Sequence, residues 1–131
     1  ARSGLPLELV GWDISISSAV VDTARHEAMA AIDTPFAEFA VSIARRVREV
    51  VMGYGLEGDD LPDPIAMAHA IDPAPASVER LWVDVMVGDG PQRGVVDVDR
   101  MGVTGAAPTI DLVTHYPEEH FFEMLFAALR T

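Results

Sequence analysis

The sequence contains no cysteine and no lysine, and each absence removes a class of function. Without cysteine there can be no disulfide, thiolate metal site or cysteine nucleophile, so a metal ion would need oxygen or imidazole ligands. The absence also fits a reducing cytoplasm, where we expect the protein. All nine basic residues are arginines, against 21 acidic residues, and the net charge of -12 opposes binding to a phosphate backbone. We therefore expect no nucleic acid partner.

Long apolar runs are also missing, although half of the residues are hydrophobic. A membrane-spanning helix needs about 20 predominantly apolar residues, and no run in this chain approaches that length. The chain does not open with a basic and then apolar leader. Its 131 residues are close to the usual size of a domain and can bury one core. The sequence predicts a soluble protein, one domain or a large part of one, with no membrane partner.

The chain opens with a strand followed by a helix. An apolar run over residues 5–14 predicts a strand buried on both faces. Only four loop-like residues precede it, and an inner strand needs neighbours, so we expect that an upstream part of the fold is missing. Ser15 or Ser17 can cap a helix that runs to about Ile32.

A second helix is predicted after Thr34, its cap, with Pro35 in the first helical position. Apolar residues repeat at intervals of three and four up to Gly53, which ends the helix. Positive charge in the last turns complements the helix dipole, and three arginines supply it: Arg45, Arg46 and Arg48. We interpret them as a solvated face, with the lining of a substrate cleft as the alternative.

The next stretch joins an acidic loop to an apolar helix. Residues 53–60 are rich in glycine and acid, which predicts a solvated loop that could move as a lid. Asp63 precedes Pro64, a pairing typical of an N-cap, and a helix is expected from there to Ile71. The Asp63 carboxylate can also bind calcium, but calcium takes about six to eight oxygen ligands and one aspartate cannot hold it alone.

The second half of the chain is mainly extended. Residues 79–87 alternate with a period of two, residues 88–91 supply a turn, and residues 92–99 return antiparallel. A short strand over residues 109–114 and a helix that begins at Pro117 follow. This order of elements predicts an α/β chain that completes a mixed sheet.

Other possible metal ligands are weaker candidates. Glu57, Asp59 and Asp60 lack the alternate-residue spacing of a calcium loop, and we interpret them as part of the solvated loop. Asp97 and Asp99 share one side of a predicted strand and its exit, and we interpret them as a solvent face. The four histidines show no pair at helical i, i+4 spacing and are interpreted as structural.

Several short motifs occur in a fixed order along essentially the whole chain. They cover residues 3–15, 63–66 with 71–73, 83–85 with 93–94 and 96–97, and 121–129. Together they resemble the C-terminal part of the inosine-uridine-preferring nucleoside hydrolase family. The resemblance implies an α/β fold with a mixed, mostly parallel sheet flanked by helices and a late antiparallel hairpin. It also implies that residues 1–131 are the C-terminal portion of one domain whose N-terminal metal-binding part is absent.

The resemblance implies nucleoside N-ribohydrolase chemistry, in which a calcium-bound water cleaves the bond between base and ribose. The expected cofactor is Ca²⁺ in the complete enzyme, and the expected roles are nucleoside catabolism and purine salvage. In relatives most calcium ligands and the general base lie in an aspartate-rich N-terminal motif, which has no counterpart here. The chain alone is therefore expected to be inactive. Its expected partners are a ribonucleoside, the missing N-terminal portion and further copies in a homo-oligomer.

Two adjacent residues, Pro62 and Asp63, correspond to functional positions of the family. Asp63 matches the family's late calcium ligand, whereas Pro62 stands where many relatives have a histidine implicated in protonating the leaving base. Proline has no proton to give, so the catalytic acid stays unassigned. Another group could protonate the base, the site could favour purines, or the activity could have changed. A different hypothesis is a non-catalytic module that keeps the half-fold and uses exposed strand edges for assembly.

Overall fold

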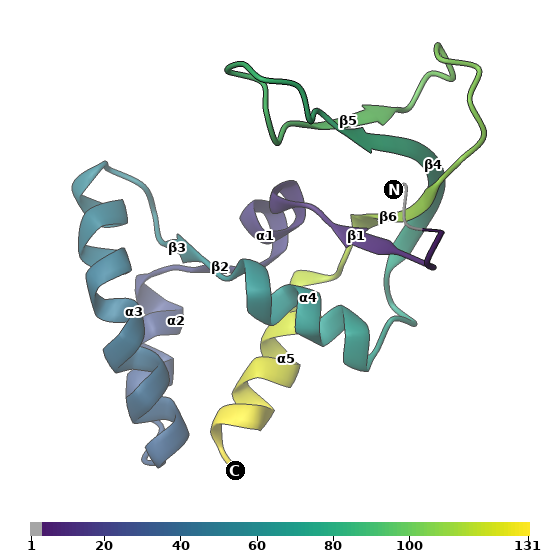
Figure 1. Ribbon diagram of the computed structural model, residues 1–131. Helices are drawn as coiled ribbons and strands as arrows, with labels where there is room; N and C mark the ends of the chain where they lie inside the picture. Colours follow the sequence, from purple (N-terminus) through teal and green to yellow (C-terminus); the bar gives the residue numbers. More distant parts are fainter. Residues whose placement is uncertain (1–3) are drawn as a thin grey trace. The chain divides into compact units, whose positions relative to one another are not determined.

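The computed structural model describes residues 4–131 (Figure 1). Contacts divide the chain into two compact units. One combines the residues up to Gly11 with Ser77–His115, and the other combines Trp12–Ala76 with Tyr116–Thr131. Within residues 4–131, no helix is both long and apolar enough to cross a membrane.

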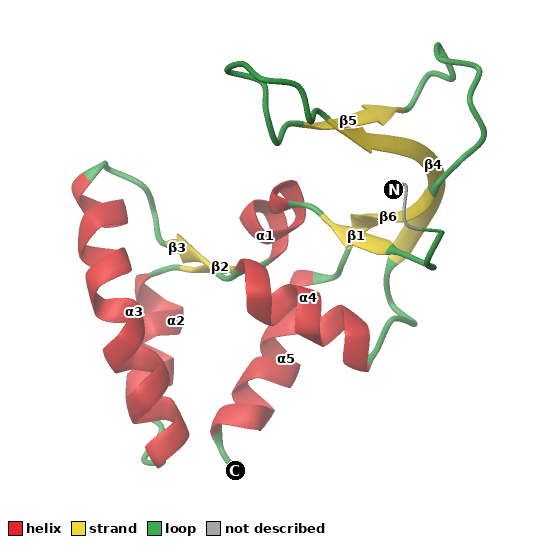
Figure 2. Cartoon of the chain, in the orientation of Figure 1, coloured by secondary structure: helices red, strands yellow, loops and turns green. Residues whose placement is uncertain are grey.

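The described residues of the first unit form a mixed sheet of four strands in the order β1-β6-β4-β5 (Figure 2). Strand β1 runs parallel to β6, whereas β4 is antiparallel to both β6 and β5. The strands are β1 (Glu8–Val10), β4 (Ser77–Val85), β5 (Val96–Asp99) and β6 (Ile110–His115). The predicted α/β class with a mixed sheet is confirmed, and in the described part of the chain this sheet has one parallel pair, β1–β6.

The late hairpin is confirmed with a longer connection than expected. Strand β5 begins at Val96 rather than near residue 92, and Asp84 lies opposite Asp97. The connection is closed by backbone hydrogen bonds from Gly94 and Met86, the latter to Val95 at 2.9 Å. At the other side of β4, the Thr109 hydroxyl bonds to both the N–H and the C=O of Val83, so a side chain extends the ladder toward β6.

The second unit contains the helices and a two-stranded antiparallel ribbon. The helices are α1 (Trp12–Ser18), α2 (Thr23–Ala30), α3 (Pro35–Gly53), α4 (Pro62–Ile71) and α5 (Glu118–Leu129), and the ribbon pairs β2 (Val20–Val21) with β3 (Asp59–Asp60). Its buried side chains include Ile14, Ile65, Tyr116 and Phe121. The predicted second and last helices are confirmed, and Thr34 caps α3 by accepting a hydrogen bond from the Ala37 N–H.

Residues 5–32 differ from the prediction. The expected strand over residues 5–14 is only β1, whose residues are exposed or half-buried, and α1 begins directly after Gly11. The expected single helix over residues 15–32 is divided into α1, β2 and α2. The β-branched pair Val20–Val21 forms a strand instead, because β3 supplies a partner and Asp22 caps a new helix through the Arg25 N–H. Ser15 and Ser17 lie inside α1 and are not caps.

The start of α4 also differs. The helix begins at Pro62, its N-cap is Leu61, and no side chain among residues 4–131 caps it. The prediction that Asp63 is the cap is therefore wrong: Asp63 lies within the first turn, where a negative charge still complements the helix dipole. The predicted end of the helix before Asp72 is confirmed.

Helix α3 carries the predicted apolar stripe, but the stripe is exposed. Its members lie at intervals of three and four and are 43% to 63% accessible: Phe36, Phe39, Ile43, Val47 and Val50. The buried residue of this helix is Ala37. The described part of the chain therefore leaves the larger apolar face of α3 uncovered.

Gly58 allows the backbones of β2 and β3 to approach closely. A Cβ atom at this position would lie 2.2 Å from the Val21 carbonyl oxygen. Because the obstacle is backbone, the ribbon itself would have to move. We expect Gly58→Ala to lower the free energy of unfolding by about 1–3 kcal/mol, measured by urea denaturation. Gly88→Ala is the control, since a Cβ there meets no atom within 4 Å; equal losses for both variants would contradict the close approach.

Candidate functional site

The candidate calcium ligand Asp63 is exposed in the first turn of α4. Among residues 4–131 its carboxylate has no hydrogen bond or ion pair. The side chain is therefore available to a ligand, and its hard oxygens suit calcium. Pro62, beside it, occupies the first helical position and offers neither an N–H nor a side-chain proton.

The short strand β3 leads into this turn and is held on two sides. Side chains alternate across a strand, so Asp59 and Asp60 point in opposite directions. Asp60 accepts hydrogen bonds from Ser15 Oγ and from Trp12 Nε1, the second at 2.7 Å, both from α1. The Leu61 N–H, one residue on, donates to the Ala19 carbonyl at 3.1 Å.

On the other side of β3, Asp59 forms an ion pair with Arg48 of α3. Arg48 Nη1 lies 2.9 Å from Asp59 Oδ1 and 2.8 Å from the Val21 carbonyl oxygen. The two side chains are only 12% and 5% exposed. The interpretation of Arg48 as a solvated residue and of Asp59 and Asp60 as a solvated loop is therefore wrong. The sequence offered no sign of these partners, because 45 residues separate Ser15 from Asp60.

Two histidines of the second unit form an aromatic and hydrogen-bonding cluster with Tyr116. His69 is buried and meets the Tyr116 ring edge-on, with 6.0 Å between centroids. His120 Nε2 lies 3.0 Å from Asp72 Oδ2, and the Tyr116 hydroxyl donates to the Asp72 carbonyl. Burial raises the pKa of Tyr116, and the Asp72 charge adds to this effect. The cluster ties the end of α4 to α5, which agrees with structural roles for these histidines.

No complete metal site exists in the described part of the chain. Among residues 4–131, no three histidine or acidic side chains are grouped so that they could hold an ion. Asp63 fits calcium as one ligand of a set, since its carboxylate is exposed and uncommitted. The histidine and acidic side chains of residues 4–131 do not complete such a set around it.

Asp99 shows why the acidic pair at the end of β5 is not such a site. Its carboxylate accepts hydrogen bonds from the Val103 N–H, the Thr104 N–H and the Thr104 hydroxyl, at 2.6–2.9 Å. The Thr104 hydroxyl is the largest of the causes that lower the pKa of Asp99 to about 2. Asp99 therefore organises the loop after β5, and the neighbouring Asp97 is exposed as expected.

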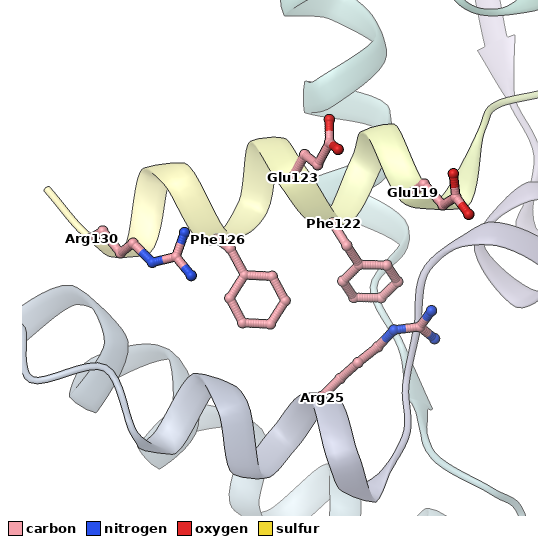
Figure 3. A pocket seen from close by; sticks show the side chains of 6 residues that line it. All are labelled: Arg25, Glu119, Phe122, Glu123, Phe126 and Arg130. Carbon is pink, nitrogen blue, oxygen red and sulfur yellow. The ribbon is translucent and has the colours of Figure 1, made fainter.

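A shallow cavity of about 480 Å³ lies along α2 and α5 (Figure 3). Arg25 stacks over the Phe122 ring at 4.0 Å and pairs with Glu118 at 2.8 Å. The cavity is lined by two arginines, two phenylalanines and two glutamates: Arg25, Glu119, Phe122, Glu123, Phe126 and Arg130. None of these residues belongs to β3 or α4, so the cavity is separate from the turn that carries Asp63.

The sequence profile of the inosine-uridine preferring nucleoside hydrolase family matches residues 1–123. The chain belongs to this family. A pyrimidine-specific ribonucleoside hydrolase RihA from Shewanella woodyi is 24% identical over 139 aligned positions, covering 99% of this chain and 42% of that protein.

Solved nucleoside hydrolases share the fold. A purine-preferring ribonucleoside hydrolase from Gardnerella vaginalis superposes with a TM-score of 0.78 at 21% identity, over 98% of this chain and 41% of that one. A plant nucleoside hydrolase superposes with a TM-score of 0.85 at 18% identity, over 98% of this chain and 42% of that one. The family expected from the short motifs is thus confirmed. The chain spans about two fifths of the length of the relatives it matches.

The buried ion pair between Arg48 and Asp59 should dominate the stability of the ribbon. We expect Asp59→Asn to lower the free energy of unfolding by about 3 kcal/mol, because it leaves the mostly buried guanidinium without its counter-charge. Glu49→Gln is the matched control, since Glu49 pairs with Arg46 on the exposed face of the same helix, where such a pair contributes less than about 1 kcal/mol. Urea denaturation of both variants measures the difference; similar losses would contradict the account.

The lowered pKa of Asp99 makes the stability of the fold depend on pH. A carboxylate whose pKa is lower in the folded than in the unfolded state stabilises the fold when the pH is above the unfolded-state pKa. This stabilisation is lost as the pH falls from about 4 toward 2. Thr104→Val should raise the pKa of Asp99 toward its ordinary value of 3.8, because the largest cause of the shift is removed. A ¹³C NMR titration of the Asp99 carboxyl measures this. An unchanged midpoint in the variant would show that the hydroxyl is not responsible.

Proposed function

We propose that this chain is the C-terminal part of a calcium-assisted nucleoside N-ribohydrolase and that Asp63 is one of the calcium ligands. The observation that carries the proposal is the family match over residues 1–123, combined with an exposed and uncommitted Asp63 carboxylate in the first turn of α4. Ribonucleosides are the proposed substrate class. The names of the relatives include both pyrimidine-specific and purine-preferring enzymes and do not favour one base.

The chemistry divides between what the ion supplies and what this chain supplies. Bound calcium would orient the attacking water and the ribose hydroxyls. Asp63 would hold the ion from the first turn of α4, where backbone hydrogen bonds of Leu61 on one side and Ile65 on the other hold the chain. Pro62 cannot protonate the departing base, so a group elsewhere in the complete protein must do so. Purine salvage is one role consistent with this activity.

The chain alone should be inactive. Calcium needs about six to eight oxygen ligands, and among residues 4–131 no three histidine or acidic side chains are grouped to supply them. We propose that the other ligands belong to the portion of the fold that accounts for the remaining length of the relatives. The exposed apolar stripe on α3 favours association with this further portion of the fold.

A second candidate function is assembly without catalysis. The same exposed stripe on α3 favours it, because five large apolar side chains on one helix face can bury against a second copy of the chain. A stable homodimer that is indifferent to calcium would support this alternative. A dependence of nucleoside hydrolysis on Asp63 would exclude it.

The proposal is tested by joining this chain to the N-terminal portion of a related hydrolase and measuring inosine and uridine hydrolysis. We expect calcium-dependent activity from the joined protein and none from the 131-residue chain. Asp63→Asn should reduce kcat/KM at least ~100-fold, because it removes a charged ligand. The control is Asp33→Asn, an exposed aspartate between α2 and α3. Hydrolysis by the chain alone, or full activity of Asp63→Asn, would overturn the proposal.

A further inference from the structure

We propose that Ser15 and Asp60 are positioning residues for Asp63. They fix the backbone from which its carboxylate approaches calcium, and they do not bind the ion themselves. The part of this inference that concerns calcium rests on the proposed function. The part that concerns the backbone rests on the hydrogen bonds around β3.

Asp60, three residues before Asp63, is attached to helix α1. Its Oδ2 accepts hydrogen bonds from Ser15 Oγ and Trp12 Nε1. Ser15 is 0% exposed, so its hydroxyl donates to a charged acceptor away from water. Such charge-assisted bonds are roughly twice as strong as neutral ones. The Asp60 oxygen that faces α1 is therefore committed within the protein.

Backbone hydrogen bonds on both sides of Asp63 hold the segment that follows Asp60. Asp60 pairs with Val20 in the ribbon, and the Leu61 N–H donates to the Ala19 carbonyl. The Leu61 carbonyl in turn accepts the hydrogen bond of the Ile65 N–H at 3.2 Å, and Ile65 is fully buried. Asp63 lies midway between Leu61 and Ile65, so its backbone is held from both ends.

The residues next to Asp63 restrain its backbone further. Prolines flank Asp63 on both sides, and each fixes its own φ near about −65°. The backbone at Asp63 is thus restrained while its carboxylate remains exposed and uncommitted among residues 4–131. The backbone at Asp63 therefore has little conformational freedom to lose when an ion binds. Restraint of this kind by supporting residues raises metal affinity.

The contact on the opposite side of β3, between Asp59 and Arg48, is expected to have a different effect when it is lost. Asp59 and Arg48 connect the ribbon to α3 rather than to α1. Their loss should destabilise the unit as a whole. Loss of the Ser15 hydroxyl should instead act first on the segment from Asp60 to Ile65.

The inference is tested by amide hydrogen exchange of the 131-residue chain, followed by NMR. We expect Ser15→Ala to speed exchange at Leu61 and Ile65 about tenfold or more. The Asp72 amide, which donates to Ala68 at the far end of α4, should change less than about twofold. The matched control is Ser17→Ala in the same helix, whose hydroxyl donates to the Ile14 carbonyl; it should leave Leu61 and Ile65 unchanged. No effect of Ser15→Ala, or equal acceleration at Asp72, would overturn local positioning.

Calcium affinity of the joined protein, measured by calorimetry, separates the inference from the proposed function. We expect Ser15→Ala to weaken binding about 10–100-fold, and Asp63→Asn to abolish it. If Asp63→Asn abolishes binding but Ser15→Ala leaves it unchanged, the positioning role fails and the proposed function stands. If Asp63→Asn leaves binding unchanged, the proposed ligand and its positioning residues both fail.

Discussion

The two-residue strand β3 is the constraint on which the candidate site depends. It is too short to be stable through backbone pairing alone, and its two aspartates attach it to helices on opposite sides. Asp59 uses a nearly buried ion pair with Arg48, and Asp60 uses hydrogen bonds from α1. A buried charge is tolerated only when it is paired, so these contacts specify one position for the ribbon. Helix α4 then begins where the ribbon ends.

This arrangement gives a partial site with a defined chemistry. Asp63 offers one exposed carboxylate from a restrained turn, and Pro62 beside it offers no proton. Membership of the nucleoside hydrolase family and the superposition on solved nucleoside hydrolases supply the context. The chain covers about two fifths of those proteins, and the uncovered apolar face of α3 agrees with a polypeptide that buries more surface when further protein is present.

Much of the fold follows from local signals. The Thr34–Pro35 start of α3, the period-two pattern of the hairpin and the acidic first turn of α5 are each readable from neighbouring residues, and the structure confirms them. Residues 12–32 were not predictable in this way. Val20 and Val21 become a strand because β3, distant in the sequence, lies beside them, and a helical pattern does not reveal that partner.

The candidate site, like the fold, could be predicted from the sequence only in part. A short motif points to Asp63, but Asp63 is not the helix cap, since the helix starts at Pro62, two residues before the predicted start at Pro64. The engagement of Arg48, Asp59 and Asp60 escaped prediction because a run of acidic residues after glycine reads as solvated loop. The close approach at Gly58, where a side chain would collide with the Val21 backbone, becomes visible only in the structure.

The most direct measurement is a crystal structure of this chain joined to the N-terminal portion of a related hydrolase, grown with calcium. We expect a calcium ion about 2.3–2.6 Å from an Asp63 carboxylate oxygen, with Asp60 still hydrogen-bonded to Ser15. A calcium ion bound entirely by other residues, with Asp63 left in solvent, would contradict it.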